Sequence, residues 1–260
     1  MPLAAGAGAY RTAAETRVHP KAMQLQSNEY VIPELIIGGE WSSTIRLTNR
    51  GTQPIQTTNV YFADNAGNDL QATFQATDGS ILTGTGFSFS LAVGGFAEAT
   101  FIGGTTAFGS AIIDYCATAA GCAARGVYGE VTLTNHNATR PDFQSVFPFE
   151  RPSALQYMLF DGRNGLTTVL YLVNENTSTS QVALDIVGPN NLILRTVSLT
   201  FASLSSQILT LHVLAPETIG IQGTLVIHGQ NPSGLLITAT ALRINPSNSF
   251  TPLRSFVPAI

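Results

Sequence analysis

Charged residues are scarce in this chain of 260 residues, and the signals of several protein classes are missing. Charged side chains make up 11% of the sequence, against about 25% in a typical soluble domain. Lysine occurs once, at Lys21, and the net charge is −4, so no basic patch points to a nucleic-acid partner. No apolar run reaches the roughly 18 residues that a membrane-spanning helix needs, so we expect no transmembrane segment.

Motifs of catalysis and metal binding are also missing. The four histidines, His19, His136, His212 and His228, have no metal-ligand spacing with another His, Cys or carboxylate. We expect His212 and His228 to be ordinary strand residues. There is no Gly-x-Ser-x-Gly elbow and no phosphate-binding loop. The sequence therefore predicts a protein that is not an enzyme and has no cofactor and no metal.

One polar cluster keeps a second interpretation open. Asp64, Asn65, Asn68 and Asp69 surround Gly67 and supply oxygen atoms that could hold a weakly bound Ca²⁺. The favoured interpretation is a hairpin turn, in which Asp and Asn side chains satisfy the backbone.

Polarity comes instead from 30 Thr, 19 Ser and 15 Asn, a composition that suits strands and turns. Apolar and polar residues alternate with period two over residues 43–49, 87–91, 128–134 and 236–244. Turn-forming dipeptides such as Gly94-Gly95 separate these runs. Short strands at this spacing predict an all-β protein made of antiparallel β-sandwiches of the Ig-like kind.

The sequence also repeats itself. Residues 89–101 align with 199–211, and residues 127–135 align with 237–245, both at an offset of 110 positions. Residues 44–49 align with 169–174, and both segments end at an Asn. We interpret this as an internal duplication: an N-terminal extension over 1–26, a first domain over 27–150 and a second over 151–260. The first copy has two insertions, 73–86 and 115–125, which we expect to be loops.

The two cysteines bear on the cellular compartment. Cys116 and Cys122 are separated by five small residues, and a loop of that size can close into a disulfide. The first 20 residues lack the basic start and the apolar stretch of a secretory signal. The sequence predicts a Cys116–Cys122 disulfide in a mature secreted or cell-surface chain whose signal peptide has been removed. Two buried unpaired thiols are the alternative.

Several turn and strand positions resemble a known group. They are Gly38-Gly39 with Trp41, the strand ending at Asn49, Val60-Tyr61-Phe62 before the turn at 64–67, and the run 241–246. This pattern, over about residues 30–258, resembles secreted two-domain β-proteins of soil bacteria such as acidobacteria. The resemblance implies a β-fold and secretion. It implies no catalytic or binding residue.

Three functional hypotheses follow. The first is a non-enzymatic extracellular structural or cell-surface protein that forms a homo-oligomer or filament through sheet edges and its N-terminal arm, with Val18, Met23 and Leu25 as contacts. The alternative is a carbohydrate-binding module with a polysaccharide as partner. Exposed aromatic rings would then stack on sugars, and the candidates are Trp41, Tyr61, Tyr115 and Tyr128. A hydrolase built on a sandwich is a third, weaker option.

Overall fold

The computed structural model describes residues 11–12, 30–114, 127–136, 138, 141–150, 152–229, 236–247 and 249–257. Over these residues the protein is all-β, and its strands pair antiparallel. The chain divides into two compact units. Unit 1 comprises Met1–Asp64 and Asn68–Glu150, and unit 2 comprises Asn65–Gly67 and Arg151–Ile260. No helix in the described part is long and apolar enough to span a membrane.

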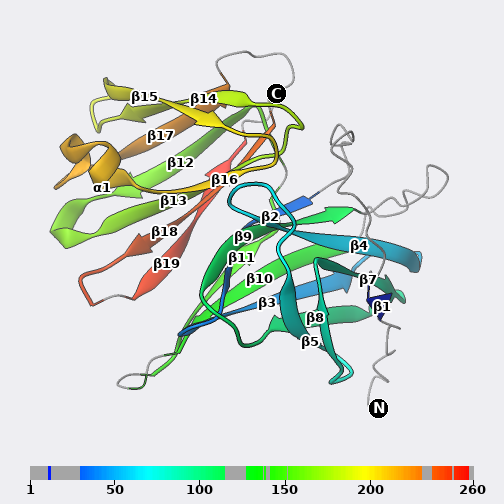
Figure 1. The fold of residues 1–260 in the computed structure, drawn as a ribbon. Helices are drawn as coiled ribbons and strands as arrows, with labels where there is room; N and C mark the ends of the chain where they lie inside the picture. The colour runs from blue at the N-terminus through cyan, green and yellow to red at the C-terminus, as the bar shows by residue number, and fades with distance from the viewer. Residues whose placement is uncertain are drawn as a thin grey trace. The chain divides into compact units, whose positions relative to one another are not determined.

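Unit 1 contains two antiparallel sheets (Figure 1). Sheet A has the strand order β1-β7-β4-β9-β2, and sheet B has the order β11-β10-β3-β8-β5-β6. The strands are β1 (Arg11–Thr12), β2 (Tyr30–Ile37), β3 (Trp41–Asn49), β4 (Ile55–Asp64), β5 (Ala72–Ala76), β6 (Ile81–Gly84), β7 (Gly86–Leu91), β8 (Phe96–Phe101), β9 (Ala107–Asp114), β10 (Val127–Asn135) and β11 (Phe143–Pro148).

The alternating runs 43–49, 87–91 and 128–134 lie in the half-buried strands β3, β7 and β10, as expected from their period, whereas the run 236–244 lies in β18, which is buried on both faces over most of its length. In β3, Ile45 and Leu47 are fully buried, whereas Arg46 between them is exposed. The turn that precedes β3 needs glycine, because Gly38 has a φ of 82° and a Cβ there would come within 2.6 Å of the Thr105 carbonyl oxygen.

The prediction of a loop over residues 73–86 is wrong. This stretch contributes to a hairpin, β5–β6, which extends sheet B beyond β8. Phe74 and Ala76 are buried and Gln75 is exposed, so the stretch has the period of a strand. The turn is closed by Asp78, whose carboxylate accepts hydrogen bonds from the Ser80 backbone N–H (3.0 Å) and hydroxyl (2.6 Å).

Phenylalanine rings join the two sheets of unit 1. Phe62 and Phe87 come from sheet A, and Phe74 and Phe101 come from sheet B. The ring centroids of Phe62 and Phe101 lie 4.9 Å apart in an edge-on arrangement, and those of Phe74 and Phe87 lie 5.2 Å apart. Each ring is essentially inaccessible to solvent. Burial of these rings is therefore a main source of stability in unit 1.

Unit 2 is one eight-stranded antiparallel sheet with the order β15-β14-β17-β12-β19-β18-β13-β16. β19 links its two halves, because it pairs with β18 along its length and with β12 at Tyr157 and Met158. The strands are β12 (Leu155–Asp161), β13 (Thr167–Asn174), β14 (Ser180–Val187), β15 (Ile193–Phe201), β16 (Ser206–Thr210), β17 (Gln222–Gly229), β18 (Ile237–Ile244) and β19 (Phe250–Phe256).

The two halves of the unit 2 sheet share one core. Met158, Leu184 and Leu225 from one half pack in the same buried cluster as Leu172 and Ala241 from the other. Three short helical turns interrupt the strands: η1 (Arg163–Gly165), α1 (Leu211–Leu214) and η2 (Pro216–Thr218).

The expectation that His212 lies in a strand is wrong, because His212 is the second residue of α1. Its neighbour Leu211 is buried in the core, so a single helical turn can anchor there through one side chain. The expectation that His228 lies in a strand is met in β17.

Each unit contains a buried asparagine that holds a turn. Asn49, at the end of β3, donates from Nδ2 to the carbonyl of Gln53 (2.8 Å) and accepts the Gly51 N–H (2.9 Å). Asn174, at the end of β13, donates to the carbonyl of Ser178 (3.1 Å) and accepts the Asn176 N–H (3.1 Å). The backbone groups of each turn have no partner in a neighbouring strand, and the Asn side chain forms hydrogen bonds with them instead.

The N-terminal extension has one described element. Strand β1 pairs with β7 of the same chain, with Arg11 opposite Ser88 and Thr12 opposite Phe87. It therefore lies at an edge of sheet A. The proposed contacts Val18, Met23 and Leu25 lie outside the described residues.

Candidate functional site

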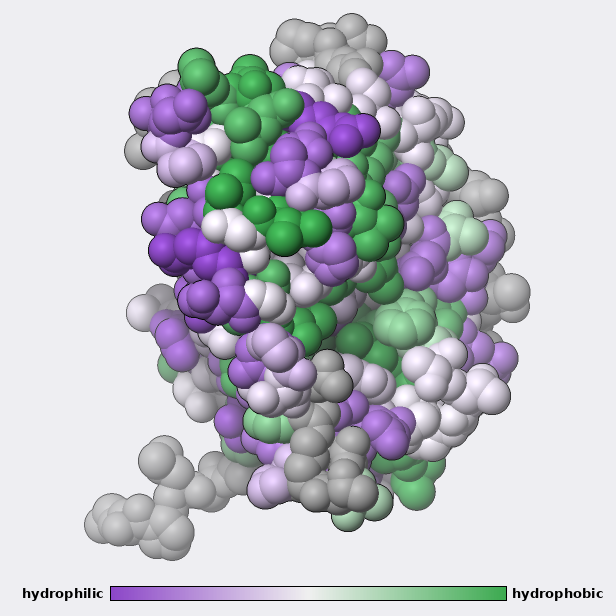
Figure 2. Space-filling view, turned by 90° about the vertical axis from the view of Figure 1, so that its left-hand side faces the viewer, coloured by the Kyte–Doolittle hydropathy of each residue, from purple (hydrophilic) through white to green (hydrophobic). Residues whose placement is uncertain are grey.

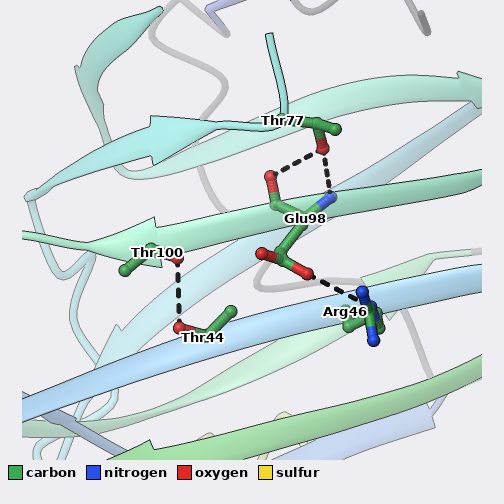
Figure 3. A network of polar contacts seen from close by, with 5 residues as sticks. All are labelled: Thr44, Arg46, Thr77, Glu98 and Thr100. Carbon is green, nitrogen blue, oxygen red and sulfur yellow. Dashed lines mark hydrogen bonds and ion pairs between the residues drawn. The ribbon is translucent and has the colours of Figure 1, made fainter. Parts of the chain in front are cut away.

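The outer face of sheet B carries a ladder of paired polar side chains (Figure 3). The Thr44 and Thr100 hydroxyls lie 3.1 Å apart, and Arg46 Nε lies 3.1 Å from the Glu98 carboxylate. The Thr77 hydroxyl accepts the Glu98 N–H at 2.7 Å. Thr44 and Arg46 lie on β3, Glu98 and Thr100 lie on the adjacent β8, and Thr77 follows directly after β5. Half of the Arg46 side chain is exposed. The ladder ties strands together and offers no unpaired acid or base.

A second cluster joins a serine, a histidine and an aspartate at one end of sheet B. Ser42 Oγ lies 3.1 Å from Nε2 of His136, and Nδ1 of His136 lies 2.8 Å from Oδ2 of Asp142. Ser42 is the second residue of β3, and its pairing with Thr134 brings it beside the end of β10, where His136 follows. This order of atoms is the one found in Ser-His-Asp catalytic triads.

Solvent exposure limits what this cluster can do. In serine hydrolases the carboxylate is buried, so its charge holds the imidazole in place and stabilises the imidazolium. Here the His136 and Asp142 side chains are 54% and 49% exposed, and exposed ion pairs are weak. The geometry supports a surface hydrogen-bond chain that joins β3 to the β10–β11 connection.

The sequence gives no signal for this cluster. Ser42 and His136 are 94 positions apart, and only the register of β3 on β10 brings them together.

A third cluster lies on β14, β15 and β17 in unit 2. His228 Nε2 is 2.9 Å from one oxygen of Asp185, and the Thr196 hydroxyl donates to the other at 2.6 Å. Partial burial raises the pKa of Asp185, but hydrogen bonds from Thr196 and His228 outweigh it and leave this pKa below its usual value. The hydroxyl binds the carboxylate rather than the imidazole, so the cluster contains no activated nucleophile.

Unit 2 also has a polar pocket of about 520 Å³. The Arg163 guanidinium donates to both oxygens of Asp161 at 2.9 Å, and this hydrogen-bonded pair lines the pocket with Arg243 and Gln222. The Arg163 hydrogen bond is the main reason that the pKa of Asp161 falls to about 2, and the charge of Arg243 adds to it. A smaller pocket of about 280 Å³ is lined by Phe160 and His212 among others.

The aromatic residues proposed for sugar stacking do not form one platform. Trp41 pairs with Asn135 and Tyr128 pairs with Thr48, so at about 3.4 Å per residue they lie roughly 24 Å apart along the strands. Trp41 is half-buried, and Tyr128 is covered by the Arg50 guanidinium at 4.0 Å from its ring centroid. Tyr61 lies in sheet A, and Tyr115 is outside the described residues.

The acidic turn after β4 is held by protein hydrogen bonds. Oδ1 of Asp64 accepts the backbone N–H of Asn68 at 2.8 Å, and Oδ2 accepts the Asn68 side-chain amide at 3.3 Å. The Asp64 side chain thus satisfies backbone and side-chain donors within the turn, as expected of a hairpin turn rich in Asp and Asn. Among the described residues, no group of three or more His, Cys, Asp or Glu could hold a metal ion, near Asp64 and Asp69 or elsewhere.

Cys116 and Cys122 lie outside the described residues, so their pairing stays a prediction. No protein-family model matches the chain, and no curated protein matches it.

Proposed function

We propose that this chain is a non-enzymatic, extracellular structural or cell-surface protein that associates with copies of itself through its N-terminal segment and its sheet edges. The observation that carries the proposal is strand β1, which sheet A takes up at the edge of β7. An edge that accepts a strand from its own chain presents the same backbone groups to a strand from another chain. The low charge and the predicted disulfide support an extracellular location.

We further propose that the chain arose by duplication of an Ig-like sandwich, with domains over 27–150 and 151–260. The strand orders support this. The strands of the two units are matched in the order in which they follow along the chain, with β1, β5 and β6 left out. The order β7-β4-β9-β2 in unit 1 then corresponds to the order β15-β14-β17-β12 in unit 2. The order β11-β10-β3-β8 matches β19-β18-β13-β16 in the same way. The hairpin β5–β6 is then an insertion in the first copy.

Strand registers support the same proposal. Ile45 pairs with Ala99 on β8 and with Val131 on β10. In the sequence alignments of the two copies, Ile45 corresponds to Leu170. Its partners Ala99 and Val131 correspond to Leu209 and Ala241. Leu170 does pair with both of these residues. The buried asparagines Asn49 and Asn174 correspond to each other in the same alignment that matches Ile45 with Leu170.

Exchange of β1 between copies is the mode of association that we propose. The pairing of Arg11 and Thr12 with β7 is short, and the same pairing can form with β7 of a second copy. Such an exchange needs no new type of contact, which makes strand swapping a low-cost route to oligomers.

The test of self-association is deletion of residues 1–26, followed by sedimentation at matched concentrations. The control is a chain in which the order of residues 1–26 is scrambled, so that length and composition are kept. We expect both variants to be smaller species than the intact chain. Unchanged association of both variants would show that the N-terminal segment is not the connector.

The absence of enzymatic activity is tested at Ser42. We expect a fluorophosphonate probe to leave the mass of the intact protein unchanged, because the His136–Asp142 pair is open to water. Stoichiometric labelling of Ser42 that disappears in His136→Ala would contradict the proposal and identify a hydrolase.

A further inference from the structure

The larger pocket of unit 2 lies at one end of its core. Its walls come from the end of β12, the β14–β15 turn, the start of β17, the end of β18 and the middle of β19. Figure 2 looks at the molecule from the side on which α1 lies in Figure 1, and it shows hydrophilic and apolar surface side by side there. A volume of about 520 Å³ falls in the range of about 300–1,000 Å³ that is typical of sites for small ligands.

Arg243 occupies an unusual place in this pocket. Ile237, Ala239 and Ala241 belong to the buried core, and with the period of two along a strand Arg243 follows them on the same face of β18. Its guanidinium forms no hydrogen bond and no ion pair with any other described residue.

The charge balance of the pocket favours an anion. Asp161 also lines it, but its carboxylate is bound at both oxygens by Arg163, so that pair contributes no net charge. With Arg243, the described lining residues therefore carry a net charge of one positive unit. A guanidinium is a planar fork of donors that matches a carboxylate, so an organic acid is the ligand class that fits.

The remaining lining suits a hydroxylated ligand. Gln222 and Thr224 are among the residues that line the pocket, and their side chains form no hydrogen bond with another described residue. Their amide and hydroxyl groups can both donate and accept hydrogen bonds. Leu159 and Leu253 supply apolar wall, and Leu159 is 59% exposed. This mixture of apolar wall and a few polar groups is typical of sites for small ligands.

We propose that this pocket binds a small hydroxylated organic acid of the size of a uronic acid, with its carboxylate held by Arg243 and its hydroxyls by Gln222 and Thr224. The site is independent of self-association, since it is built from residues of unit 2 only. It gives a surface protein a means to contact acidic sugars.

The test measures binding of glucuronate to the intact chain by saturation-transfer NMR and calorimetry at low salt, with glucose as the neutral control. We expect glucuronate to bind at least about tenfold more tightly than glucose. The reason is that a hydrogen bond to a charged group contributes more free energy than a tenfold change in affinity requires. Arg243→Gln should remove this preference. Arg254→Gln changes an exposed arginine on β19 and should keep it.

The proposal would be overturned by equal binding of glucuronate and glucose, or by equal glucuronate binding by Arg243→Gln and the unchanged chain. If Arg243→Gln does not fold, the double variant Gln222→Ala/Thr224→Ala replaces it. That variant should weaken glucuronate several-fold while acetate binding stays the same. A loss of acetate binding equal to that of glucuronate would also contradict the proposed contacts.

Discussion

Asn174 offers the sharpest test of how the turns of this protein are held. Its side chain is fully buried and sits at the corner between β13 and β14. Nδ2 donates to the carbonyl of Ala202 at 2.7 Å and to that of Ser178 at 3.1 Å. Oδ1 accepts from the backbone and side chain of Asn176 at 3.1 and 2.6 Å. One residue thus fastens two separate turns.

The Asn174→Ala variant should lose about 3 kcal/mol of unfolding free energy. Each hydrogen bond contributes about 1 kcal/mol net, and a partner left buried and unsatisfied costs about 1–3 kcal/mol. The loss is measured by urea unfolding of the full chain, with hydrogen exchange to show that the turns after β13 and β15 open first. Asn190→Ala is the control, because Asn190 is exposed and accepts one long bond of 3.3 Å, so its loss should stay below about 0.5 kcal/mol.

Asn49→Ala should act in the same way in unit 1. Asn49 is 1% exposed and makes equivalent bonds to Gln53 and Gly51, so we expect a loss of about 2–3 kcal/mol.

A loss below about 1 kcal/mol for Asn174→Ala would refute the reasoning, since its partners would then find water at little cost.

Three further predictions follow from packing, charge and redox state. Phe101→Ala should lose about 3–5 kcal/mol in urea unfolding, because its ring lies between Phe62 and Phe74 in the core of unit 1; a loss under 2 kcal/mol would mean that the cluster collapses around the gap. Arg163→Gln should raise the pKa of Asp161 from about 2 towards its ordinary 3.8, as followed by carboxyl NMR. In the unchanged chain the stabilisation from this ionised carboxylate is complete above pH 3.8 and is lost as the pH falls through about 2; an identical titration in both chains would contradict the pairing. Thiol titration of denatured, unreduced protein should find no free thiol if Cys116 and Cys122 are joined, and two free thiols would exclude the disulfide.

The strands were accessible to sequence reasoning, whereas the side-chain clusters were not. The alternation over 43–49 marks most of β3, because a half-buried strand repeats with period two. The strands within residues 73–86 were not predicted because the glycines and threonines of this stretch are equally typical of loops. Only the burial of Phe74 distinguishes a hairpin from a loop here. One turn of helix at His212 is too short to show a period of 3.6.

The polar clusters depend on register rather than on motif. Ser42 meets His136 because two strands pair in one alignment, and a shift by one residue would separate them. Arg243 looks like an ordinary exposed strand residue in the sequence. Its inward direction follows from Ala239 and Ala241, which face the core of unit 2.

Self-association is the central claim, and sedimentation velocity of the intact chain tests it most directly. The protein is measured over a hundredfold range of concentration at physiological salt. We expect the average mass to rise with concentration above the 27.5 kDa of a single chain. A mass that stays at 27.5 kDa over the whole range would contradict it.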